Sequence, residues 1–248
     1  MMRPADWIVP DWPVSSRVCA FITTRAGGVS AGPYASFNLG DLTADDPAAV
    51  QANKTRLDAL LPGAPRWLRQ VHGARVVHAD AVTSAVEADA AYTATPGVVC
   101  AVKIADCMPV LIADRAGTTV AAAHAGWRGL AAGVLENTIG ALPAAPEALV
   151  AYLGPAIGPT VFEVGDEVRT AFCEVDAAAA DAFRPLRPGK WLADLFRLGR
   201  QRLARCGVTQ VHGGGVCTYS NPQRFYSHRR SAVTGRMAAL IWIGERGP

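Results

Sequence analysis

Hydrophobic runs of strand length are concentrated in the central third of the chain. Val98–Ile104 and Met108–Asp114 are rich in β-branched and other apolar residues, and a third apolar run ends at His124. Short apolar runs bounded by turn residues are typical of buried β-strands. Beyond Gly129 the apolar positions recur at helical spacing, which predicts an amphipathic helix over 130–142.

The same patterns predict further elements on both sides of this region. Strands are expected over 18–24, 148–153 and 161–164 and in the closing MAALIWIG segment, and helices over 48–61, 166–180 and 190–206. Residues 68–78 are expected to form a hairpin with its turn at Gly73, and residues 87–95 a loop that leads into the central strands. Strands and helices mixed in this way, without an internal repeat or a low-complexity linker, predict a single α/β domain spanning 1–248.

Composition excludes several classes of protein. Half of the 248 residues are hydrophobic, which argues against disorder, and no apolar run reaches the roughly 20 residues that a membrane-spanning helix needs. Early prolines and an Asp interrupt the apolar core that a secretory signal requires, so we expect a cytoplasmic protein without membrane attachment. The net charge of +3 is spread along the chain, so nucleic acid is not an expected partner. Nothing in the sequence indicates an obligate oligomer, and we expect a monomer.

Three potential metal ligands, His72, Cys107 and His124, lie at predicted strand ends beside turns or polar breaks. One thiolate and two imidazoles would bind zinc and leave the fourth tetrahedral position open to water, as a catalytic zinc site requires. Their wide separation along the chain is not a compact metal-binding motif. Cys107 and His124 would serve equally as a nucleophile and its base, and a buried free thiol is the commonest fate of such a cysteine. From the residues alone, the buried thiol, the metal site and the cysteine–histidine pair stay open, in that order.

A series of longer blocks adds a resemblance to a known family. RQVHGARV, ADCMPVLIAD, HAGWRGLAAGV, YLGPAIGP with FEVG, and FYSHRR occur in this order, preceded by TTRAGGVSAGPYASFNLG. They resemble the signature blocks of the bacterial laccase-domain family, also called the polyphenol oxidase or multicopper-oxidase-like family. The resemblance implies one α/β domain with mixed sheets packed between helices, similar to the catalytic fold of certain deamidating toxins. It also implies that His72, Cys107 and His124 bind one metal ion, usually taken to be zinc. The chain departs from the family at His228, where Tyr is more frequent.

The family's activity has been described in several ways. One description is copper-dependent oxidation of phenols, and another is zinc-dependent phosphorolysis of adenosine, inosine, guanosine and methylthioadenosine together with deamination of adenosine. A third places some members in peptidoglycan quality control. Multicopper oxidases need several copper sites, which five histidines cannot furnish, whereas one Cys-His-His site suits a single zinc.

The resemblance therefore predicts a zinc-dependent purine nucleoside phosphorylase, with adenosine deaminase activity second, whose partners are a small nucleoside and phosphate. A copper polyphenol oxidase remains one alternative, and a metal-free cysteine hydrolase or amidase that uses Cys107 and His124 on a cell-wall peptide is another. A noncatalytic protein with a structural metal is less favoured, because a structural zinc site normally has four protein ligands.

The predicted activities suggest further contact residues. Phosphorolysis requires an anion site, for which the candidates are Arg128, Arg229 and Arg230. Polar residues expected to complete the nucleoside pocket are Arg25, Asn38 and Gln70. Deamination requires an acid or base, for which the candidates are Asp89, Asp106 and Glu163.

Overall fold

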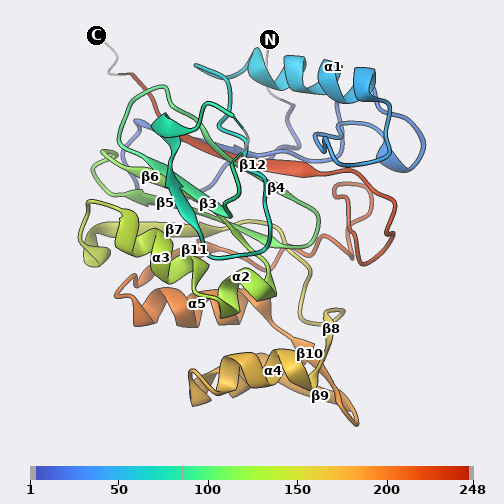
Figure 1. The fold of residues 1–248 in the computed structure, drawn as a ribbon, viewed down its shortest axis with the longest axis vertical. Coiled ribbons are helices and arrows are strands. Elements are labelled where there is room, and N and C mark those ends of the chain that lie inside the picture. The colour runs from blue at the N-terminus through green and yellow to red at the C-terminus, as the bar shows by residue number, and fades with distance from the viewer. Residues whose placement is uncertain (1–3, 85, 246–248) are drawn as a thin grey trace.

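Two β-sheets lie face to face between helices in the computed structural model of the chain, which describes residues 4–84 and 86–245 (Figure 1). The six strands of the larger sheet are, in spatial order, β11 (Gln210–Gly213), β7 (Leu149–Leu153), β5 (Met108–Asp114), β6 (Val120–Ala125), β3 (Ala90–Thr93) and β2 (Val76–His78). The smaller sheet consists of β1 (Val18–Ile22), β12 (Met237–Ile243) and β4 (Cys100–Ile104), all antiparallel. Two outer pairs of the larger sheet, β11 with β7 and β2 with β3, are parallel, so this sheet is mixed.

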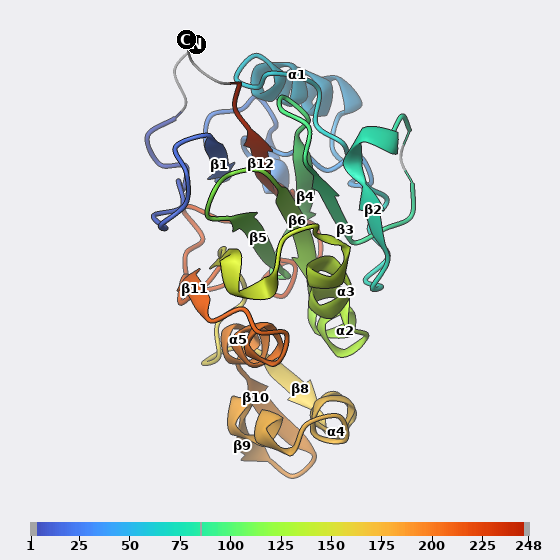
Figure 2. The same cartoon turned by 90° about the vertical axis from the view of Figure 1, so that its left-hand side faces the viewer.

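Helices cover the outer face of each sheet (Figures 1 and 2). α1 (Pro47–Asp58) buries Leu57 against Leu240 of the smaller sheet. α2 (Trp127–Ala131), α3 (Val134–Ala141) and α5 (Leu195–Arg205) pack on the larger sheet through residues such as Leu130 and Leu198. A third apolar cluster, which includes Leu111, fills the space between the sheets. This arrangement confirms the predicted α/β fold with mixed sheets packed between helices.

β6, like β5 and β3, contributes residues to two of these clusters. All six of its residues are buried. Ala121 and Ala123 belong to the cluster beneath the helices, and Ala122 belongs to the cluster between the sheets. Because alanine is small, the layers on both sides of β6 can pack close to its backbone.

A small third sheet projects beyond α5 (Figure 2). It consists of β8 (Glu163–Gly165), β10 (Lys190–Ala193) and β9 (Phe183–Arg187), and α4 (Asp166–Cys173) packs beside it. The helix predicted over 190–206 is therefore wrong at its start. Gly189, with φ +71°, precedes β10, and the Asp194 side chain caps α5 by accepting a hydrogen bond from the Arg197 backbone N–H. The helix predicted over 166–180 ends at Cys173, and the 3-10 segment Ala177–Ala182 follows it. Other 3-10 segments are Gly32–Tyr34, Ala79–Ala81 and Pro146–Ala148.

Two predictions close to the central strands also differ from the structure. The hairpin expected over 68–78 is absent, because only β2 is a strand there and it pairs in parallel with β3, inside the segment predicted as a loop. A single helix was expected over 130–142, but the structure has two, α2 and α3. The first begins at Trp127, and Gly133 lies between the two. Gly133 has φ +90°, a left-handed conformation that cannot continue an α-helix. No helix in the described part of the chain is long and apolar enough to cross a membrane.

Candidate metal centre and cavity

Two strand ends and one loop bring the three predicted metal ligands together. Cys107 directly precedes β5, His124 is near the end of β6, and His72 lies at the tip of a loop. Their ligand atoms all lie within 4.8 Å of one another. Antiparallel pairing places Met108 opposite Ala125, so the start of β5 and the end of β6 meet at one edge of the sheet.

Asp89 fixes both histidines. Its fully buried carboxylate accepts hydrogen bonds from the backbone N–H of His72 (2.9 Å), Val71 (3.1 Å) and Gly73 (2.7 Å), and lies 2.8 Å from His124 Nδ1. A carboxylate has about four lone-pair sites, so these four contacts use its full acceptor capacity. With Nδ1 of His124 bound to Asp89, Nε2 is the ring atom that could bind a metal. Asp89 therefore orients the ligands and is not available to a substrate.

In the metal-free cluster, charge interactions stabilise the Cys107 thiolate and a protonated His124, whose proton a metal ion would have to displace. Burial opposes ionisation of the Cys107 thiol, but His124 and His72 hold the pKa of Cys107 well below that of a free thiol. Burial likewise opposes protonation of His124, but the Cys107 thiolate and Asp89 raise its pKa above the usual range. Burial also raises the pKa of Asp89, yet its hydrogen bonds to His124 and to backbone N–H groups lower that pKa overall. The cysteine is thus held as the thiolate, which is the form that binds metals.

The donor set fits a zinc ion. Zinc accepts thiolate and imidazole ligands in tetrahedral geometry, and three protein ligands leave one position open. Gly126 keeps space beside the sulfur, since a Cβ atom there would lie 2.6 Å from Cys107 Sγ. Within residues 4–84 and 86–245, this is the one group of three such ligands close enough to share an ion.

A cavity of about 720 Å³ opens from this cluster, a size typical of small-molecule sites. Its apolar wall includes Trp67, Trp127, Ile157, Phe162 and Leu195. Its positively charged residues are Arg69, Lys103, Arg128, Arg229 and Arg236. Asp41 and Asp106 are the acidic residues on the wall, so cations outnumber carboxylates among the described residues around it.

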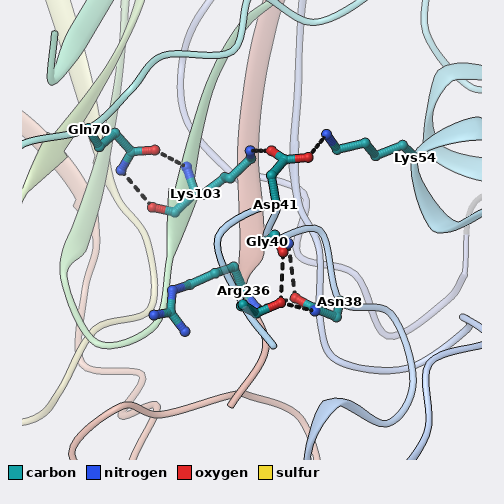
Figure 3. A network of polar contacts seen from close by, with 8 residues as sticks. Asn38, Gly40, Asp41, Lys54, Gln70, Lys103 and Arg236 are labelled. Carbon is teal, nitrogen blue, oxygen red and sulfur yellow. Dashed lines mark hydrogen bonds and ion pairs between the residues drawn. The ribbon is translucent and has the colours of Figure 1, made fainter. Parts of the chain in front are cut away.

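Four of the predicted contact residues line the cavity: Gln70, Asp106, Arg128 and Arg229. The Gln70 amide pairs with the backbone N–H and carbonyl of Lys103, at 2.8 Å each, in the manner of a neighbouring strand (Figure 3). Asp106 accepts hydrogen bonds from the Thr218 and Ser227 hydroxyls and from the Arg229 backbone N–H. It therefore holds the segment that carries Arg229 against the cavity.

The structure places the other predicted contacts, Arg25, Asn38, Asp89, Glu163 and Arg230, outside the cavity wall. Arg25 and Arg230 donate their guanidinium hydrogens to backbone carbonyl groups. Glu163 forms a two-pronged ion pair with Arg187, with N–O distances of 2.6 and 2.9 Å. Asn38 is fully buried and is bonded entirely within the protein.

The fold also brings to the cavity three charged residues that the sequence pattern did not indicate: Asp41, Lys103 and Arg236 (Figure 3). The Asp41 carboxylate forms ion pairs with Lys103 and Lys54, and Lys103 Nζ lies 4.7 Å from the centre of the Trp67 ring. Burial raises the pKa of Asp41, but the two lysines lower it below the usual range. The sequence feature that could have indicated Lys103 is its position as the one charged residue in the otherwise apolar strand β4.

Comparison with known proteins gives one consistent result. The family described as multi-copper polyphenol oxidoreductase laccase matches residues 19–244. A Pseudomonas aeruginosa protein named purine nucleoside phosphorylase is 55% identical over 96% of this chain and 99% of its own length. An Escherichia coli protein of the same name, YfiH, is 54% identical over 95% and 98%. A crystal structure from Neisseria meningitidis has a TM-score of 0.94 at 49% identity and covers 97% of this chain and 100% of that one. The structure of YlmD from Geobacillus stearothermophilus has a TM-score of 0.88 at 30% identity, with 99% and 98% covered.

Proposed function

The chain belongs to the multi-copper polyphenol oxidoreductase laccase family, and from this membership and its site we propose that it is a zinc-dependent purine nucleoside phosphorylase. Relatives of that name share more than half of their aligned residues with it. The observation that carries the proposal is that one cavity joins the three-ligand cluster to Arg128 and Arg229. Neither arginine forms an ion pair with a carboxylate of the described chain, so both are available to a phosphate.

Phosphorolysis transfers the sugar from the purine to phosphate. The bond between N9 and C1′ breaks, a phosphate oxygen forms a new bond to C1′, and the base leaves with the electron pair. The proton carried by hydrogen phosphate ends on the purine, so the reaction needs no further reactant. Enzymes accelerate such a step by holding both reactants in place and by stabilising the charge that develops.

The cavity residues can perform both tasks. The Arg128 guanidinium lies 4.5 Å from the centre of the Trp127 ring and that of Arg229 lies 5.2 Å from the centre of Phe162, contacts that restrain both groups. In the proposed complex they hold the phosphate, while Trp67 and the other apolar residues of the wall receive the purine. His72, Cys107 and His124 would hold the zinc ion, which when bound supplies a Lewis-acidic centre beside the cavity.

The direct test is to measure zinc by elemental analysis and to assay adenosine with and without phosphate. We expect stoichiometric zinc and release of adenine that requires phosphate, with inosine, guanosine and methylthioadenosine as further substrates. Zinc removal should abolish turnover, and zinc should restore it. Nucleosides left intact by the zinc-loaded protein in the presence of phosphate would contradict the proposal.

Deamination of adenosine is the second activity that we propose. Asp106 lies on the cavity wall beside Cys107, and its carboxylate accepts three hydrogen bonds. Since a carboxylate has about four acceptor sites, one remains for a proton transfer at the substrate. This activity predicts inosine formed from adenosine without phosphate, and its absence would confine the enzyme to phosphorolysis.

A different class of enzyme shares the same residues. Cys107, His124 and Asp89 are arranged as nucleophile, base and orienting carboxylate, which is the geometry of a cysteine hydrolase. Such an enzyme would survive chelation and be inactivated by alkylation of Cys107, whereas the zinc phosphorylase would be inactivated by chelation. Copper-dependent oxidation of phenols is the weaker alternative, because several copper sites are needed and the described residues form one ligand group.

A further inference from the structure

Arg236 lies on the wall of the same cavity, directly before β12, and has no role in the proposed function. Its backbone is fastened on both sides: the N–H donates to Asn38 Oδ1 at 2.8 Å, and the carbonyl accepts from the Leu39 N–H at 3.0 Å. The same Asn38 oxygen accepts from the Gly40 N–H at 2.9 Å (Figure 3). Asn38 was expected to line the pocket, but it is buried. Its side chain instead links the loop that contains Gly40 to Arg236, which does line the cavity.

The Arg236 side chain is held as firmly as its backbone. Nη1 donates to the carbonyls of Thr234 and Gly235, at 3.0 Å each. A Cβ atom on Gly40 would lie 2.8 Å from Arg236 Cγ, so glycine there allows the loop to pack directly on the aliphatic part of the side chain. Within the described part of the protein, Nη2 and Nε donate no side-chain hydrogen bond. One edge of the guanidinium is therefore fixed by the protein, and the other is available.

The charge of Arg236 also lacks a partner. Of the five cations around the cavity, Arg69 pairs with Glu87 at 2.6 Å and Lys103 pairs with Asp41. Arg128, Arg229 and Arg236 form no ion pair with any carboxylate of the described residues.

The environment of Arg236 makes this lack of a partner costly. Burial lowers the pKa of Arg236, whereas the negative charges of Cys107 and Asp106 raise it. The guanidinium therefore interacts electrostatically with the end of the cavity where Cys107 lies. Removing a cation from water is costly unless an anion pairs with it. The arrangement therefore favours a bound anion at this arginine.

We propose that Arg236 contacts the attacking phosphate, together with Arg128 and Arg229. The inference rests on the proposed phosphorylase activity for the source of the anion. A planar guanidinium with Nε and Nη2 available presents two parallel donors, which match two oxygens of a phosphate. Because its backbone and Nη1 are already fixed, little conformational entropy is lost when phosphate binds.

The test compares the zinc-loaded wild type with Arg236→Gln, Arg236→Lys and, as the matched control, Arg69→Gln. The Gln variants each remove one positive charge from the cavity wall, but Arg69 is already neutralised by Glu87. KM is measured for phosphate and for adenosine, and the Kd of inorganic phosphate is measured by calorimetry without nucleoside. Arg236→Gln should weaken phosphate by about 10- to 100-fold, with little change in the KM for adenosine. The phosphate affinity of Arg236→Lys should lie between those of the wild type and Arg236→Gln. The phosphate affinity of Arg69→Gln should equal that of the wild type.

Each outcome separates this inference from the proposed function. If the wild type cleaves nucleosides and Arg236→Gln binds phosphate normally, the role of Arg236 is overturned and the phosphorylase stands. If the wild type binds phosphate without cleaving nucleosides, the phosphorylase fails and the Kd values still decide the role of Arg236. A wild type that binds no phosphate overturns the inference. The inference is also overturned if Arg236→Gln binds inorganic phosphate normally and loses affinity only for a nucleoside 5′-monophosphate. The anion that Arg236 contacts would then be part of the substrate. Zinc content and thermal unfolding confirm that the variants are folded.

Discussion

Replacing Asp89 with Asn tests whether one carboxylate orients two metal ligands. The asparagine side chain has nearly the same shape but offers one oxygen and one NH2 group, so two of the four groups around it lose their acceptor. If the nitrogen replaces Oδ2, the N–H groups of Val71 and Gly73 are unpaired; if it replaces Oδ1, His72 N–H and His124 Nδ1 are affected. In the second case the amide donates to Nδ1 and favours the tautomer with a proton on Nε2, which cannot bind a metal.

The magnitude follows from these contacts. A hydrogen bond to a charged group is worth about 1.5–3 kcal/mol, so losing two should lower the free energy of unfolding by about 3–6 kcal/mol. A displaced loop tip or a wrong tautomer should also weaken zinc binding by about 10- to 100-fold, the usual effect of removing a partner that orients a ligand. Both effects have a single cause, so they should appear together.

Urea unfolding of the zinc-free protein measures the first effect, and competition with a chromogenic chelator measures the second. The matched control is Asp80→Asn, because Asp80 also lies close to a histidine, His78, at 2.9 Å, but both side chains are partly exposed. The Asp80 carboxylate also accepts hydrogen bonds from the Thr93 and Thr95 hydroxyls, so that control should cost about 1–3 kcal/mol, but it should leave zinc affinity unchanged. Normal zinc affinity in Asp89→Asn, with a stability loss as small as that of the control, would refute the orienting role.

Four further outcomes are expected. His72→Asn keeps a residue that tolerates the φ of +61° at this position but removes a ligand, so elemental analysis should show zinc loss while the urea midpoint of the zinc-free protein stays unchanged. In the zinc-free protein Cys107 should react with iodoacetamide at lower pH than an ordinary thiol, because its pKa is lowered, and zinc should protect it; mass spectrometry showing reaction only at alkaline pH would contradict this. Leu130→Ala, at a fully buried position, should lower the free energy of unfolding by about 2–5 kcal/mol in urea. The pKa of Asp89 is lower in the folded than in the unfolded state, so its ionised form stabilises the fold above about pH 4 and this contribution is lost as the pH falls through the folded pKa; the stability difference between wild type and Asp89→Asn should shrink in acid.

The sequence predicted best the elements whose residues are buried on both faces. The strand expected over 108–114 has the same bounds in the structure, because an uninterrupted apolar run between polar breaks has few other stable environments. The errors lie where the outcome depends on distant partners. β2 pairs with β3 and not with the segment before it, and Lys190–Ala193 forms a strand because β8 and β9 lie on either side of it.

The site shows the same division. Cys107 and His124 lie at the strand ends that the local pattern predicts, whereas His72 lies at a loop tip where a strand end was predicted, and the structure brings the three together. Lys103 and Arg236 line the cavity only because β4 and β12 are neighbours, a pairing between residues far apart in the chain. Local sequence likewise could not show that the Asn38 side chain is buried and accepts a hydrogen bond from the backbone of Arg236.

The alanines of β6 restrict how this protein can change over evolutionary time. A larger side chain at Ala121 or Ala123 would push against the helix layer, and one at Ala122 would push against the opposite sheet. Either displacement would move the strand that ends in His124, and with it the distance from that imidazole to Cys107. Residues that contact neither metal nor substrate are thereby subject to selection on the chemistry, and drift along this strand should be confined to small side chains.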